Sequence, residues 1–141
     1  MNIYIGSPFF SNEQIQQVKD IEEAILKSGH DYYSPMRHSV LKDMTPKERA
    51  NSARKVFDEN IAEMDKADLI LAMTDDFDPG TVFEIGYSFG TRKDIITYSP
   101  NNYGANVMLS QASCGHYTDL KVLANSLSSG KYTTIPMETT E

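Results

Sequence analysis

Two carboxylates, Asp78 and Glu84, lie six residues apart around a proline and a glycine. Asp78 is placed to cap a helix that begins at Pro79, because proline at the first helical position has no N–H to leave unpaired. Glu84 then falls about one turn into the helix, near the positive end of its dipole, which favours an ionised carboxylate. Gly80 lets a ligand approach the backbone. The segment is therefore predicted to form an active site in which Glu84 acts as an anion.

The same residues permit a purely structural interpretation of Glu84. Thr81 and Glu84 match the S/T-x-x-E pattern of a capping box, in which the glutamate returns to the backbone N–H of the cap. However, the segment follows the most apolar run of the chain, Asp68–Met73, which is typical of a strand buried on both faces. Ligands of open α/β sheets bind just past the carboxyl ends of such strands, so this position favours the active-site interpretation.

Strand and helix patterns alternate along the chain. Strands are predicted at residues 2–6, 31–34, 68–73 and 94–98. Helices are predicted at about 11–29, 46–66 and 79–90, with shorter ones at 106–112 and from residue 120. Alternation of this kind implies right-handed crossovers between parallel strands. We therefore predict one domain, residues 1–141, with an α/β fold: a three-layer sandwich in which a parallel, flavodoxin-like sheet of about five strands carries helices on both faces.

Apolar residues at helical spacing predict which helix faces meet the core. In the helix at 79–90 these residues are Val82, Ile85 and Phe89. In the helix at 46–66 they are Ala50, Ala53, Phe57, Ile61 and Met64. Residues 35–43 are predicted to form a polar connection. The final residues through Glu141 are predicted either to be frayed or to form a last edge strand around residues 132–135.

Composition limits the possible partners. The net charge of −7 leaves no basic stripe for a nucleic-acid polymer or an anionic membrane, so a small ligand is expected. The single cysteine, Cys114, excludes an internal disulfide and is typical of a reducing cytoplasm, where we expect the protein. Cys114 and His116 do not make a zinc site, because no third or fourth ligand lies at suitable spacing. The longest apolar run, Leu69–Met73, is too short to cross a bilayer.

Three segments, in order along the chain, carry a resemblance to a known family. Ile3–Phe10 is similar to an opening strand and loop, and Asp78–Tyr87 matches the signature D-x-G-T-x-x-E-x-G-Y. Asn106–Met108 is similar to an N-x-M segment after the fourth strand. Together they resemble the nucleoside 2-deoxyribosyltransferases, whose relatives include nucleotide N-glycosidases. The resemblance extends from Ile3 to about Ala112.

This resemblance implies a reaction. The family's glutamate, here Glu84, attacks C1′ of a 2′-deoxynucleoside and expels the base, and a second base then takes the sugar from the deoxyribosyl ester. Tyr4 matches a tyrosine that hydrogen-bonds and orients the nucleophile. Asp78 matches an acidic residue that contacts the base or the sugar 5′-hydroxyl. The implied partners are a 2′-deoxynucleoside and a free nucleobase, with no metal and no organic cofactor.

The resemblance also implies a set of substrate-binding residues. They are Gly6, Ser7, Phe10, Asn60, Gly80, Asn106 and Met108. Asn106 and Met108 match positions that reach into a neighbouring subunit's site near the 5′-hydroxyl. A homo-oligomer with shared sites, either a dimer or a multiple of dimers, is therefore expected.

The chain departs from the family pattern in two places. Asn60 stands where relatives usually carry an aspartate near the base, and an amide cannot pass a proton to the leaving base. Help of this kind would then fall to Asp78, to water or to Asp58. In an earlier loop, a base-reading glutamine is replaced approximately by Ser39. Arg37, nearby, either reads a base carbonyl or a phosphate, or is simply a solvated loop residue.

Two other functions stay open at this point. One is hydrolysis of 2′-deoxynucleoside 5′-monophosphates by the same Glu84, with Gly6 and Ser7 as phosphate donors. Against it, Asp78 would bring a negative charge towards the phosphate, and Asn106 suits a neutral hydroxyl.

The other alternative is a non-catalytic nucleoside- or nucleotide-binding module. The amide at Asn60 supports this alternative, because it removes a proton donor. The intact set of Tyr4, Asp78 and Glu84 opposes it, so the transferase is the favoured interpretation.

Overall fold

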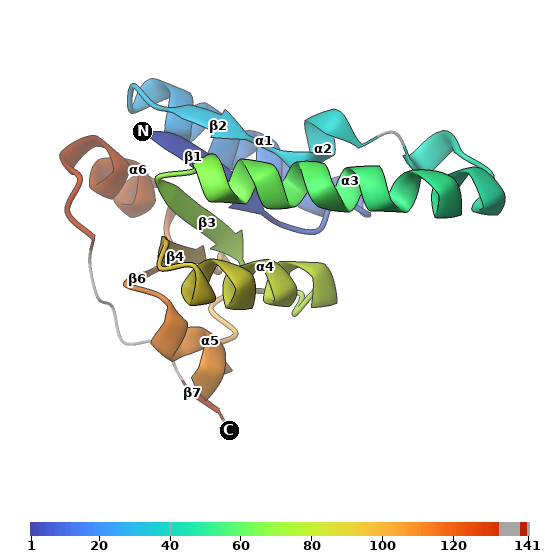
Figure 1. Cartoon of the computed structure of the whole chain (residues 1–141). Coiled ribbons are helices and arrows are strands. Elements are labelled where there is room, and N and C mark those ends of the chain that lie inside the picture. The colour runs from blue at the N-terminus through green and yellow to red at the C-terminus, as the bar shows by residue number, and fades with distance from the viewer. Residues whose placement is uncertain (40, 133–138, 141) are drawn as a thin grey trace.

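Five parallel strands form the central sheet (Figure 1). The structure is a computed structural model that describes residues 1–39, 41–132 and 139–140. The strand order is β2, β1, β3, β4, β6. The strands are β1 (Asn2–Gly6), β2 (Asp31–Tyr33), β3 (Leu69–Met73), β4 (Asp94–Tyr98) and β6 (Gly115–Tyr117). The chain goes from β1 outward to β2 and then returns to the other side of β1, so the topology switches direction between β1 and β3.

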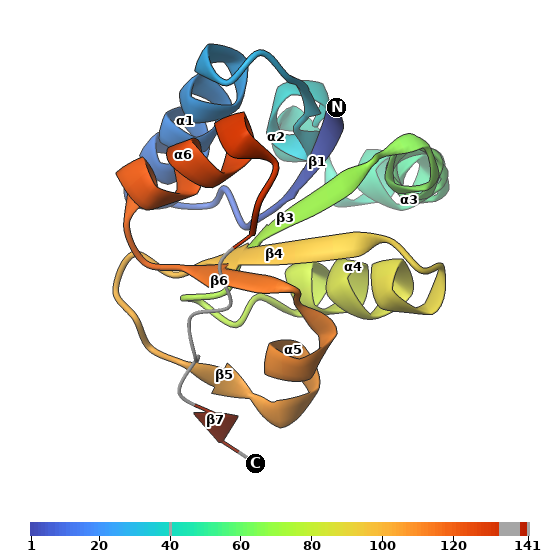
Figure 2. The same cartoon turned by 90° about the vertical axis from the view of Figure 1, so that its left-hand side faces the viewer.

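Helices cover both faces of this sheet. They are α1 (Asn12–Lys27), α3 (Pro46–Lys66), α4 (Pro79–Gly90), α5 (Val107–Ala112) and α6 (Leu120–Ser129). Figure 2 shows α1 and α6 on one face and α3, α4 and α5 on the other. Alternate strand residues enter the two cores: Ile3 and Ile5 pack with α1, whereas Tyr4 packs with α3 and α4. The predicted three-layer α/β sandwich with a five-stranded parallel sheet is confirmed.

The N-termini of the helices follow the capping residues of the sequence. Capping boxes are formed at the starts of α1 and α3, with Ser11 and Thr45 as the caps. At α4 the cap is Asp78, whose side chain accepts a hydrogen bond from the backbone N–H of Thr81 at 2.9 Å. Thr81 therefore lies inside the helix and does not cap it. The capping-box interpretation of Glu84 is wrong, and its side chain is available for other contacts.

The core-facing side of α4 differs from the predicted one. Ile85 is buried as expected, but its buried neighbours are the small residues Thr81 and Ser88. Val82 is exposed, and Phe89 keeps 60% of its surface accessible. Small side chains on the inner face let α4 lie close to the strands, and the larger apolar side chains turn outward.

The predicted apolar face of α3 is also only partly buried. Met64, near the carboxyl end, is in the core, whereas Ala50, Ala53 and Phe57 are exposed. The amino-terminal half of α3 projects beyond the sheet in Figure 1, so its apolar residues have no strands beneath them. Periodicity identified the face correctly, but not the length of sheet available to cover it.

Two short segments also depart from the prediction. The connection at 35–43 contains a one-turn helix, α2 (Pro35–His38), and a 3₁₀ turn, η1 (Leu41–Asp43). The fifth strand of the sheet is β6, which the sequence did not reveal because its three residues lack a β-branched run and depend on pairing with β4. Of the possible edge strand at 132–135, residues 133–135 lie outside the described residues. A two-stranded pair joins β5 (Ala105–Asn106) to β7 (Thr139–Thr140).

No helix within the described parts of the chain is both long enough and apolar enough to span a bilayer.

Candidate active site

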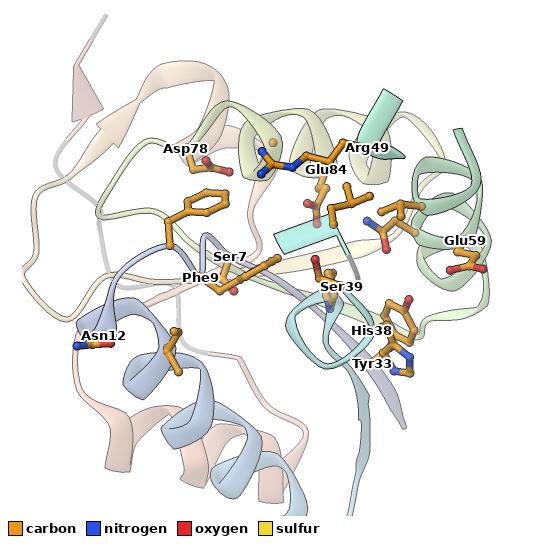
Figure 3. A pocket seen from close by; sticks show the side chains of 17 residues that line it. Ser7, Phe9, Asn12, Tyr33, His38, Ser39, Arg49, Glu59, Asp78 and Glu84 are labelled. Carbon is orange, nitrogen blue, oxygen red and sulfur yellow. The ribbon is translucent and has the colours of Figure 1, made fainter. Parts of the chain in front are cut away.

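A cavity of about 650 Å³ opens at the carboxyl ends of β1 and β3, where the topology switches direction. Figure 3 shows α4 along one side of it, with Tyr33, His38 and Ser39 facing from the other. Its polar and aromatic lining residues are Ser7, Phe9, Phe10, Asn12, Tyr33, His38, Ser39, Arg49, Glu59, Asn60, Asp78 and Glu84. The cavity therefore combines aromatic walls with a few convergent polar groups, as ligand sites do.

Glu84 lies directly over the end of β1. A Cβ atom at Gly6 would be 3.2 Å from Glu84 Oε2, so glycine leaves the room that this carboxylate occupies. Oε2 is buried, and so is the hydroxyl oxygen of Tyr4; neither has a hydrogen-bond partner among the described residues. The two groups influence each other. The pKa of the Tyr4 hydroxyl is raised mainly by burial and, in second place, by the nearby Glu84 carboxylate. The predicted pairing of Tyr4 with Glu84 is thus supported by their proximity.

The electrostatic environment of Glu84 differs from the simple expectation of an anion held by a helix dipole. Burial raises the pKa of its carboxyl group to about 7; the Tyr4 hydroxyl opposes this rise, and the negative charge of Asp78 adds to it. Desolvation therefore outweighs the helix dipole. Near neutral pH the group is divided between its acid and carboxylate forms.

Asp78 combines two roles. Its Oδ2 atom accepts from the backbone N–H and the hydroxyl of Thr81, at 2.9 and 3.2 Å, and the residue also lines the cavity. A Cβ at Gly80 would lie 3.1 Å from the same oxygen, so Gly80 accommodates this cap. Capping fixes the carboxylate at the rim of the cavity beside Glu84.

Most of the predicted substrate-binding residues reach the cavity. Ser7, Phe10, Asn60 and Gly80 line it, and Gly6 lies beneath Glu84. Phe10 is 77% exposed and stacks on Phe9 with their ring centroids 5.4 Å apart. These two rings form an apolar rim that a planar ligand could cover.

Asn106 and Met108 are not among the cavity-lining residues of the same chain. Asn106 caps α5, accepting from the backbone N–H of Met108 at 2.7 Å. Met108 keeps 75% of its surface exposed. Their predicted contribution to the site of a neighbouring subunit stays a prediction.

Of the two aspartates predicted to replace the missing acid at position 60, Asp78 lies at the cavity and Asp58 does not. Asp58 pairs with Arg54 at 3.0 Å on the exposed side of α3 and does not line the cavity. Glu59, one residue further, does line it. Successive residues of a helix point in directions about 100° apart. Asp58 therefore points to solvent, whereas the next residue, Glu59, points to the cavity.

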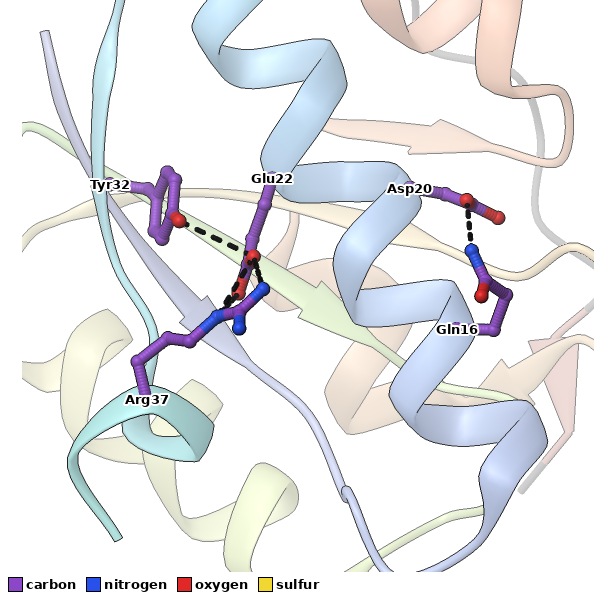
Figure 4. A network of polar contacts seen from close by, with 5 residues as sticks. All are labelled: Gln16, Asp20, Glu22, Tyr32 and Arg37. Atoms are coloured by element: carbon purple, nitrogen blue, oxygen red, sulfur yellow. Dashed lines mark hydrogen bonds and ion pairs between the residues drawn. The ribbon is translucent and has the colours of Figure 1, made fainter.

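Arg37 does not line the cavity and pairs with Glu22 (Figure 4). Its guanidinium donates two hydrogen bonds from Nε to Glu22, at 3.1 Å, and a third from Nη2 at 2.6 Å. Tyr32 donates a further bond to Glu22 at 3.3 Å. Glu22 is 4% exposed and belongs to α1, so the ion pair ties α2 to α1. Arg37 is therefore an ion-paired residue at a partly exposed position outside the cavity lining, and base reading by it stays a prediction.

Several cavity residues were not predicted, among them Phe9, Tyr33, His38 and Arg49. Tyr33 is the last residue of β2. It could have been predicted as a site residue, because ligands bind at the carboxyl ends of parallel strands. His38 stacks on Tyr33 with a centroid distance of 4.5 Å. Arg49 comes from the first turn of α3 and carried no local signal, because only the placement of α3 in the folded chain brings that turn to the cavity.

Among the described residues there is no group of three or more histidine, cysteine or acidic side chains placed to hold a metal ion.

Comparison with known proteins identifies the family. The model of the family described as nucleoside 2-deoxyribosyltransferase matches residues 3–120. The chain belongs to this family. Its members include enzymes that act on nucleosides as transferases or as N-glycosidases. No curated protein sequence matches the chain.

Solved structures show the same fold as this member of the nucleoside 2-deoxyribosyltransferase family. A 2-deoxyribosyltransferase from Bacillus psychrosaccharolyticus is 24% identical, with a TM-score of 0.80 over 89% of this chain and 91% of that one. The CMP N-glycosidase BcmB from Clostridium botulinum is 18% identical, with a TM-score of 0.58 over 93% and 100%. A conserved protein from Enterococcus faecalis V583 is 18% identical, with a TM-score of 0.62 over 96% and 90%.

The raised pKa predicts how Glu84 affects stability. Between the ordinary glutamate pKa of 4.5 and the folded value of about 7, the folded chain binds more protons at this group than the unfolded chain. Stability is therefore lost as pH rises through this window. Glu84→Gln should be more stable than the wild type at pH 8, by up to about 3 kcal/mol. Urea unfolding at pH 8 and pH 4 measures this, and an equal difference at both pH values would contradict it.

The Arg37–Glu22 pair predicts a second change in stability. Arg37→Ala leaves the Glu22 carboxylate buried with only Tyr32 as a partner, and should lower the free energy of unfolding by about 1–2 kcal/mol, less than for a fully buried pair because Arg37 is half exposed. Lys27→Ala is the matched control, since Lys27 pairs with Glu23 on the exposed side of α1. Equal urea midpoints for the two variants would show that the buried pair stabilises nothing.

Proposed function

We propose that this protein is a nucleoside 2-deoxyribosyltransferase that exchanges the nucleobase of 2′-deoxyribonucleosides. The observation that supports this proposal is the Glu84 carboxylate, which lies in the cavity over Gly6 beside the buried hydroxyl of Tyr4. Glu84 is only partly buried and lines the cavity, so its carboxylate can reach a carbon of a ligand held there. Membership of the family favours the same class of reaction.

The chemistry consists of two displacements at C1′ of the sugar. Glu84 attacks C1′ as a carboxylate, and the C1′–N bond breaks with its electron pair passing to the departing base. A nitrogen of the second base then attacks C1′ and the Glu84 carboxylate departs, so the two inversions give net retention. Without an electron-withdrawing 2′-hydroxyl, positive charge develops at C1′ more easily. Tyr4 orients the carboxylate.

Asp78 supports a nucleoside as the substrate. Its carboxylate is held at the rim beside Glu84 by its bonds to Thr81. A neutral sugar hydroxyl can donate a hydrogen bond to such a group, whereas a phosphate dianion would be repelled by it.

Hydrolysis of 2′-deoxynucleoside 5′-monophosphates is the second candidate, and Arg49 favours it. Arg49 and Ser7 both line the cavity, and guanidinium and hydroxyl groups are common phosphate donors. In that reaction water would replace the second base at C1′.

We further propose that the active unit is a homo-oligomer in which Met108 reaches the site of a neighbouring subunit. Aromatic side chains on α3 and α4 support association. The exposed rings of Phe57 and Phe83 have centroids 5.8 Å apart, and the partly buried ring of Tyr87 lies 6.4 Å from that of Phe83. Contiguous exposed apolar surface of this kind marks interaction sites.

Base exchange is the direct test of the reaction. Incubation of the protein with deoxyinosine and free adenine should produce deoxyadenosine, and a deoxynucleotide alone should release no free base. Glu84→Ala should reduce exchange by at least about a thousandfold, as removal of a nucleophile does. Glu23→Ala, which removes an exposed carboxylate of α1, is the control. Undiminished exchange by Glu84→Ala would exclude Glu84 as the nucleophile, and free base from the nucleotide would favour the hydrolase.

Complementation tests the shared site. Met108→Asp and Glu84→Ala should each be inactive alone, but an equimolar mixture assembled together should regain about a quarter of wild-type activity if the unit is a dimer, because half of the random dimers then hold one intact site. Light scattering gives the subunit number. A mixture with no more activity than the separate variants would show that each site belongs to one chain.

A further inference from the structure

We propose that His38 protonates the departing nucleobase. This inference rests on the proposed base-exchange function, and assigns to the chain a proton donor that the amide at Asn60 cannot supply. His38 lines the same cavity as Glu84 and Asn60, from the side that faces α4 (Figure 3).

A stack of three rings positions this imidazole. Tyr33 stacks on Tyr4 with a centroid distance of 5.8 Å and an angle of 18°, and His38 stacks on Tyr33 at 4.5 Å and 10°. Tyr4 lies against Glu84, so the stack leads from the nucleophile to the cavity wall. The side chain of His38 makes no hydrogen bond within the described residues, so both ring nitrogens remain available to a ligand. Stacking on Tyr33 thus fixes the plane of the His38 ring and leaves its N–H group able to reach a ligand.

The backbone that carries His38 is held independently of the cavity. His38 is the last residue of α2, and its neighbour Arg37 binds the buried carboxylate of Glu22 in α1. This ion pair fixes α2 on the sandwich from outside the site. His38 can therefore meet a ligand without contributing to that anchor.

The other ionisable groups of the cavity are poorer proton donors to a base. Asp78 already accepts two hydrogen bonds from Thr81. Glu59 is exposed and lies 3.9 Å from Lys55, and Arg49 does not give up a proton in proteins. The phenol of Tyr33 has a pKa raised by burial and by nearby carboxylates, which weakens it as an acid. Imidazole is the side chain that gains and loses a proton between pH 5 and 8.

The proposed step balances as follows. Glu84 forms a bond to C1′, the C1′–N bond breaks with its electron pair moving onto the base, and the proton of imidazolium His38 passes to a ring nitrogen or exocyclic oxygen of that base. Neutral base, neutral His38 and the glutamyl ester result. In the second half-reaction the incoming base loses its proton to His38, which restores the imidazolium.

The pH dependence follows from Glu84. This group must be ionised to attack C1′, so kcat/KM for a natural donor should rise with pH through the Glu84 pKa of about 7. Besides His38, the other charged or titratable groups that face the cavity are Tyr33, Arg49, Glu59 and Asp78.

Paired donors test the inference. Deoxyinosine needs a proton on its leaving base, whereas 7-methyl-2′-deoxyinosine already carries the positive charge and its base leaves neutral. His38→Gln should lose about a hundredfold in kcat/KM with deoxyinosine, as general-acid variants do, but only a few-fold with the methylated donor. His38→Phe keeps the stack on Tyr33 and should behave like His38→Gln. Free imidazole should partly restore His38→Ala. If only pyrimidines are accepted, deoxyuridine and 5-nitro-2′-deoxyuridine form the corresponding pair.

The outcomes separate this inference from the proposed function. Equal losses with both donors would make His38 a structural residue, and no loss with either would remove it from the reaction; both results overturn the inference and leave base exchange by Glu84 intact. A wild-type chain that moves no base from either class of donor would overturn the proposed function and this inference with it. A loss of about a hundredfold with deoxyinosine, and of only a few-fold with the methylated donor, is the result expected for His38→Gln.

Discussion

The burial of one carboxylate against one phenol is the interaction on which the site depends. Glu84 enters from α4 and Tyr4 from the middle of β1, and they meet where Gly6 leaves room for the carboxylate. Tyr4 belongs to the hydrophobic core as well as to the site. Packing of α4 on the sheet therefore sets the position of the Glu84 carboxylate. The same burial raises the pKa of Glu84 towards neutrality, which costs stability where the group ionises.

The inner surface of α4 explains how this burial is achieved. Thr81, Ile85 and Ser88 face the strands, so a helix with small inner residues approaches the sheet closely and brings Glu84 over the end of β1. The cost is exposure of larger apolar residues such as Phe89 on the outer side. Outward aromatic residues near α3 and α5 fit the proposed assembly of several subunits, in which a neighbouring surface would cover them.

Much of the fold was predictable because its signals are local. Capping residues, proline at the first helical position and apolar periodicity depend on residues within one or two turns, and they located α1, α3 and α4. The features that were missed depend on distant partners. β6 is a strand because β4 pairs with it, and Arg37 turned away from the cavity because Glu22 is buried on α1. Neither partner is visible in the local sequence.

By itself the sequence determined the order of the first four strands and of the longer helices, the family signature, and the placement of Asp78 and Glu84 at the end of a buried strand. Only the tertiary structure decided that Glu84 points at Tyr4 and not at its own helix terminus, and that Tyr33, His38 and Arg49 share its cavity. Local sequence patterns specify backbone conformation over a few residues. Which side chains meet across the cavity depends on how helices rotate and pack on the sheet, and that is decided by contacts between residues far apart in the chain.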